Sequence, residues 1–75
     1  MSVYGIVLFH NSSSAMRAEA TLKKVGMSIK LVPTPRELSS DCGVALRFPW
    51  ESEPEVARIL SEAKVAIAGI FEAPK

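Results

Sequence analysis

Hydrophobic residues occur in short blocks along the chain, and the spacing within each block indicates the element that it forms. Residues 3–9 are rich in β-branched and aromatic side chains, which predicts a buried strand. The polar stretch 10–14 then favours a helix start, because short polar side chains accept hydrogen bonds from the first helical amides. The predicted helix ends at Gly26, and its apolar stripe consists of Ala15, Ala18, Leu22 and Val25.

The second half of the chain repeats these signals in a different order. Apolar and polar residues alternate over 27–31 and again over 43–48, which predicts two strands separated by a loop that begins at Pro33 and Pro35. Ser52 and Glu55 have the spacing of a capping box, and the apolar stripe of a second helix follows them. Residues 65–71 form the last predicted strand.

The predicted order β-α-β-β-α-β is typical of the ferredoxin-like fold, in the α+β class. The right-handed crossover rule and antiparallel pairing lead to a four-stranded sheet of order 4-1-3-2, with both helices on one face. A different pairing of the same elements is the alternative. Residues 1–75 are too few for more than one domain. The sheet face without helices is expected to be exposed. Proteins of this architecture commonly cover such a face by forming a homodimer through it.

This topology brings residues together that are distant in sequence. Cys42, which opens the third strand, is expected near the end of the first strand and the start of the first helix. Within its reach we expect His10 and the three serines Ser12, Ser13 and Ser14, together with Arg36 from its own loop. Positive charge and helix N-termini favour the reactive thiolate form of a cysteine. Each of these residues has a plainer interpretation: helix caps for the serines, a loop position for His10, and a solvated charge for Arg36.

Composition excludes several classes of function. The formal net charge is +1, which is too balanced for broad attraction to nucleic acid or to an anionic membrane. The strands also lack the paired aromatic residues of a ferredoxin-like RNA-binding domain. No apolar run approaches the length of a membrane span, and no basic segment precedes the first apolar stretch, so neither a span nor a secretory signal is expected.

The chain contains a single cysteine. One thiol cannot form an internal disulfide, and its presence suits a reducing compartment, so a cytoplasmic location is expected. A soft-metal site of this fold needs two thiolates, and no nucleophile–base set is apparent, so we expect no metal, no cofactor and no enzymatic activity. Either Cys42 is a small buried hydrophobic residue, or it is the centre of the protein's chemistry.

Residues 33–48, which read PTPRELSSDCGVALRF, closely resemble the signature of a family of small selenium/sulfur (Se/S) carrier-like proteins. The resemblance extends over nearly the whole chain and includes the helix pattern at Ala15, Ala18 and Glu19. It implies that Cys42 is the carrier residue, supported by Arg36, Gly43 and Arg47. Gly43 either supplies a backbone conformation that other residues resist or leaves space beside the sulfur.

Two hypotheses of function remain. In the first, the protein carries sulfur or selenium as a persulfide-type species on Cys42; a cysteine desulfurase or similar donor loads it, and an acceptor enzyme unloads it. In the second, the chain is a non-enzymatic binding or regulatory module for a small anion or a partner protein, and Cys42 is structural. Accessibility of the thiol distinguishes the two.

Overall fold

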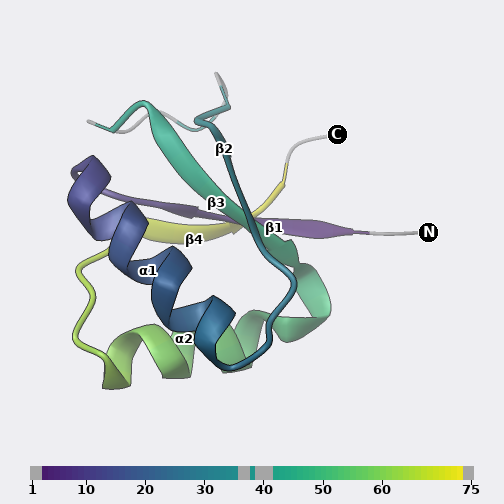
Figure 1. The fold of residues 1–75 in the computed structure, drawn as a ribbon. Coiled ribbons are helices and arrows are strands. Elements are labelled where there is room, and N and C mark those ends of the chain that lie inside the picture. The colour runs from purple at the N-terminus through teal and green to yellow at the C-terminus, as the bar shows by residue number, and fades with distance from the viewer. Residues whose placement is uncertain (1–2, 36–37, 39–41, 74–75) are drawn as a thin grey trace.

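The computed structural model describes residues 3–35, 38 and 42–73 and has the predicted architecture (Figure 1). Its elements are the strand β1 (Tyr4–Leu8), the helix α1 (Ser12–Lys24), the strands β2 (Lys30–Pro33) and β3 (Val44–Pro49), the 3-10 turn η1 (Trp50–Ser52), the helix α2 (Glu53–Glu62) and the strand β4 (Gly69–Glu72). The strands form one antiparallel sheet of order β2-β3-β1-β4, and both helices lie on the same side of it. The α+β ferredoxin-like prediction is confirmed.

The helices begin where the sequence indicated, but the capping contacts differ. The side chain of Asn11, and not of a serine, caps α1, and the three serines lie inside its first turn. Ser52 does occupy the N-cap of α2, yet its side chain forms no capping hydrogen bond. The preceding 3-10 turn η1 gives Ser52 a backbone that is not extended (φ −93°, ψ 7°), whereas a capping residue typically has an extended one.

Two strands are shifted toward the C-terminus relative to the alternation in the sequence. The strand expected at 27–31 pairs only from Lys30 to Pro33, and the one expected at 65–71 pairs from Gly69 to Glu72. Met27, Ile29 and Ile67 still pack against the core from the connecting segments, which explains why they appear in the pattern. Pro33 is tolerated inside β2 because β2 is an edge strand.

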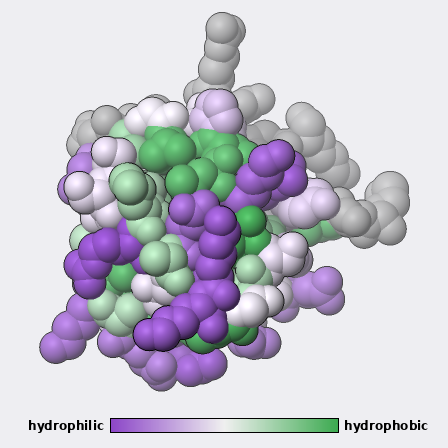
Figure 2. Space-filling model, viewed as in Figure 1, coloured by the Kyte–Doolittle hydropathy of each residue, from purple (hydrophilic) through white to green (hydrophobic). Residues whose placement is uncertain are grey.

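The main core lies between the sheet and the helices. Its large, fully buried side chains come from β1, β3 and both helices and their flanks, and they include Val7, Phe9, Leu22, Leu46, Phe48, Val56 and Leu60. From the side shown in Figure 2, hydrophilic side chains run over the outward surface of α1. In the described part of the chain, no helix has both the length and the apolar character needed to cross a bilayer.

The opposite face of the sheet is not open at its centre, which corrects the expectation of an exposed face. Ile6 and Leu8 of β1 and Ala45 of β3 point to this outer face, and they are 3%, 4% and 0% exposed. Val32, Leu38 and Ala73 pack against them and form a second, smaller core. Leu38, between β2 and β3 in the sequence, thus covers part of the outer face.

Candidate functional site

Cys42 lies just before β3, at the end of the molecule where α1 also begins (Figure 1). Leu8 pairs with Ala45, so the end of β1 lies beside the start of β3, as the topology required. Cys42 is 6% exposed and belongs to the same buried cluster as Phe9, which follows β1, and Ala15, in the first part of α1. The structure therefore places the one cysteine at the predicted corner, but inside the helix-side core.

Thr34 joins the two ends of the loop that contains Cys42. Its hydroxyl donates a hydrogen bond to the backbone oxygen of Cys42 (2.8 Å), and its N–H donates to the backbone oxygen of Gly43 (3.1 Å). In the same part of the chain, the N–H of Leu38 donates to the backbone oxygen of Pro35 (3.0 Å). Sequence reasoning missed Thr34, although a hydroxyl residue placed between two prolines was an available signal.

The start of α1 offers backbone amides near this corner. Asn11 has an extended backbone, and its side-chain Oδ1 accepts from the N–H of Ser14 at 2.9 Å. Ser12 and Ser13 are exposed at the first positions of the helix, where amides have no intrahelical partner. His10 is exposed in the bend that precedes the helix. A helix N-terminus of this kind favours small anions.

Gly43 and Arg36 complete the predicted set. Gly43 is exposed, and a Cβ added to it would have nothing within 4 Å, so there is open space beside Gly43 itself. Its φ is not in the left-handed region, so the hypothesis of a backbone conformation that other residues resist is wrong. Arg36 falls outside the described residues, and its predicted place beside the sulfur stays a prediction.

Arg47 does not belong to this corner. It alternates with Leu46 and Phe48, which are buried among the helix-side residues, so its side chain leaves β3 on the outer face. Its guanidinium lies over the ring of Tyr4, 4.5 Å from the ring centroid. The support for Cys42 that the resemblance implied for Arg47 is therefore not direct.

The chemistry available at the corner is that of one buried thiol, at the end of the molecule where α1 begins. Among the described residues, no group of His, Cys, Asp or Glu is arranged to hold a metal ion. A thiolate acts as a nucleophile toward other sulfur atoms without a metal or a cofactor. The arrangement thus suits sulfur exchange if the thiol can be reached.

A comparison with protein families gives one match. A family model described as "Putative Se/S carrier protein-like" matches residues 4–72, which is nearly the whole chain. No curated protein and no solved structure matches the chain.

Proposed function

Because the chain belongs to the Se/S carrier protein-like family, we propose that it carries sulfur or selenium on Cys42 as a persulfide-type species. The observation that supports this proposal most directly is that Cys42 is the chain's one cysteine. Carriage through a thiol therefore has only this residue to use.

The proposed loading step is an exchange between sulfur atoms. The thiolate of Cys42 attacks the terminal sulfur of a persulfide on a donor enzyme such as a cysteine desulfurase. A new S–S bond forms on Cys42, the donor's S–S bond breaks, and the donor's own thiolate leaves with the electron pair. Unloading is the same exchange, with the thiolate of an acceptor enzyme as the attacking group. The exchange needs no external oxidant or reductant, and in this proposal the protein is a carrier that one enzyme loads and another unloads.

The surroundings of Cys42 define what loading requires. A side chain that is 6% exposed must become more accessible before a donor can reach it. The open space beside Gly43 is the side from which we expect the donor to approach. Once formed, an anionic persulfide would be stabilised by the first amides of α1, at Ser12 and Ser13, and by Arg36.

Intact-mass spectrometry tests the proposal. The protein is incubated with a cysteine desulfurase and cysteine, or with selenocysteine, and the same reaction is run on Cys42→Ser. We expect a mass gain of one sulfur or one selenium that Cys42→Ser abolishes and that a thiol reductant reverses. Loading that survives in Cys42→Ser would overturn the proposal.

The burial of Cys42 favours a second candidate, a binding or regulatory module in which the thiol is structural. In that case native Cys42 resists alkylation by iodoacetamide even when the donor enzyme is present, and it reacts only in denaturant. The two candidates are separated by adding the donor, because the carrier hypothesis expects loading in the native protein and the module hypothesis expects none.

A further inference from the structure

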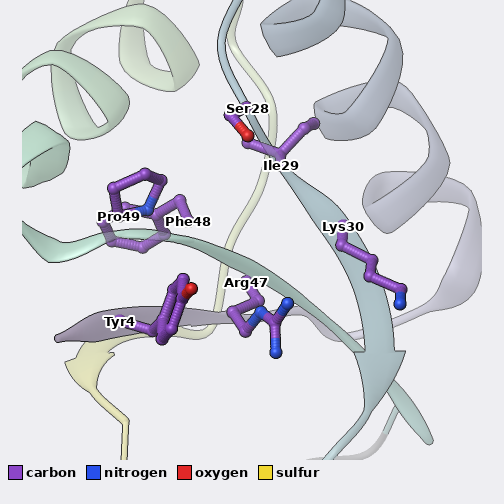
Figure 3. A pocket seen from close by; sticks show the side chains of 7 residues that line it. All are labelled: Tyr4, Ser28, Ile29, Lys30, Arg47, Phe48 and Pro49. Atoms are coloured by element: carbon purple, nitrogen blue, oxygen red, sulfur yellow. The ribbon is translucent and has the colours of Figure 1, made fainter. Parts of the chain in front are cut away.

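A cavity of about 280 Å³ lies at the end of β3 opposite to Cys42 (Figure 3). It occupies the region where the segment entering β2 diverges from β3, and its walls include Tyr4, Ser28, Lys30, Arg47 and Pro49. The sulfur-carrying function proposed above does not use it. Arg47 follows Cys42 by five residues, which along a strand is about 16 Å, and the two side chains leave opposite faces of the sheet.

Two positive side chains stand next to each other in this cavity. Lys30 of β2 is the direct cross-strand partner of Arg47 of β3, and Figure 3 shows the two side by side. Like charges directly opposite one another destabilise a sheet. The ion pairs among the described residues are Lys23–Glu19 and Arg58–Glu62, so neither Lys30 nor Arg47 is neutralised by a described carboxylate. An anion bound between them would offset this repulsion.

Arg47 is also held in position. Its backbone is paired on both sides, with Ile6 of β1 and Lys30 of β2, and its guanidinium lies 4.5 Å from the centroid of the Tyr4 ring. A cation over an aromatic face is attracted to it, and the N–H edge of the guanidinium stays available. The Arg47 side chain is therefore already partly ordered before a ligand binds. Binding then costs less side-chain entropy, which favours affinity.

We propose that this cavity binds a small oxyanion of the phosphate or sulfate type. Arg47 supplies the planar fork that matches two oxygens of such a group, and Lys30 supplies a second, point-like charge. The two cations together match a doubly charged group such as a phosphate monoester better than a single carboxylate. At about 280 Å³ the cavity far exceeds the roughly 10–15 Å³ that is needed to hold one water molecule, so it has room for the organic part of an ester as well.

A small ligand fits the charge of the protein better than a nucleic acid does. The formal net charge of +1 gives no extended positive surface that could track a phosphate backbone. The positive charge of the cavity is confined to one cross-strand pair, which suits a single anionic group.

NMR titration with inorganic phosphate, sulfate and glycerol 2-phosphate tests the proposal, with ionic strength held constant by sodium chloride. We expect saturable shifts concentrated on the resonances of Tyr4, Lys30 and Arg47. Tighter binding of glycerol 2-phosphate than of the inorganic ions would identify an ester as the ligand, and equal binding would identify the free ion.

Substitutions of Lys30 and Arg47 test whether these two side chains bind the anion. Arg47→Gln and Lys30→Gln are each expected to weaken binding at least tenfold, whereas Lys24→Gln makes the same charge change on α1 and should leave it unchanged. Lys30 is exposed, so Lys30→Gln carries the test if Arg47→Gln does not fold. Shifts that grow linearly without saturation, or equal weakening in all three variants, would show only nonspecific charge attraction and overturn the proposal.

Discussion

Cys42 is held differently by its side chain and by its backbone. The side chain belongs to the apolar helix-side cluster, while the carbonyl oxygen accepts from the hydroxyl of Thr34. A residue that is part of a core and also ends a loop can become accessible if the loop end moves, without unfolding of the sheet. On this basis the proposed carrier function is compatible with the burial of the thiol.

Gly5 is a position where the packing leaves no room for a Cβ atom. Its cross-strand partner is Phe48, and an added Cβ would collide with the Phe48 ring and lie 2.6 Å from Cε3 of Trp50. We expect Gly5→Ala to lower the free energy of unfolding by about 1–3 kcal/mol, because the buried Phe48 ring has little room to move. Urea denaturation followed by circular dichroism measures this.

Gly43→Ala is the matched control for that substitution. The added Cβ meets nothing within 4 Å, so we expect a change within about 0.5 kcal/mol. Similar losses of stability in both variants would contradict the packing explanation. Normal stability with slower loading of Cys42 in Gly43→Ala would support Gly43 as the donor's approach.

At the scale of elements, the two helices end in similar turns built from different residues. After α1, Gly26 has φ +80°, and the N–H of Met27 donates to the oxygen of Leu22 (3.1 Å). After α2, Lys64 occupies the equivalent place with φ +57°, and the N–H of Val65 donates to the oxygen of Leu60 (3.0 Å). Both turns need a left-handed residue, which glycine supplies with less strain than lysine.

We therefore expect Lys64→Gly to raise the free energy of unfolding by about 1 kcal/mol, since a side chain in the left-handed region costs roughly that much. Gly26→Ala should lower it by a similar amount, because nothing lies within 4 Å of the added Cβ and only the backbone is strained. Chemical denaturation of both variants measures the pair. A loss of stability in Lys64→Gly would contradict this expectation. It would show that the lysine side chain stabilises the fold by more than its left-handed backbone destabilises it.

The helices and strands differ in how well the sequence predicts them. The apolar stripes of α1 and α2 were found because helical spacing is a local signal. Val25 is the exception, since it follows α1 as its C-cap and is 58% exposed, so its predicted place on the buried stripe was wrong. The ladder of β2 was displaced, since Met27 and Ile29 alternate as a strand would, yet they contact the core before pairing begins at Lys30. The periodicity of apolar side chains shows which residues are buried. Where the hydrogen-bonded pairing of a strand begins depends instead on the position of its partner strand.

At the scale of the whole molecule, the chain packs both faces of its sheet. The helix-side core is the larger, and the smaller outer core contains Ile6, Leu8 and Ala45. What remains exposed on the outer face includes Tyr4, at 38%, and Phe71, at 44%. The homodimer expected from the sequence would have to use these two rings, and it stays a prediction.

Sedimentation velocity over a range of concentrations tests that dimer. If it forms through the outer face, Phe71→Glu should abolish the concentration dependence, because a buried, unpaired carboxylate is costly. Met16→Glu is the control, since Met16 is 63% exposed on α1 and away from the sheet. A wild-type protein that sediments as a monomer at every concentration would contradict the prediction.

The sequence by itself determined the order and type of the elements, the strand order of the sheet, and Cys42 as the one residue able to carry sulfur through a thiol. These follow from local spacing, from topological rules and from a count of residue types. Only the tertiary structure decided that Cys42 is buried, that Thr34 bonds to it across the loop, and that Lys30 faces Arg47. Those contacts depend on strand register and on packing between segments that are distant in sequence, and no local pattern records either of these.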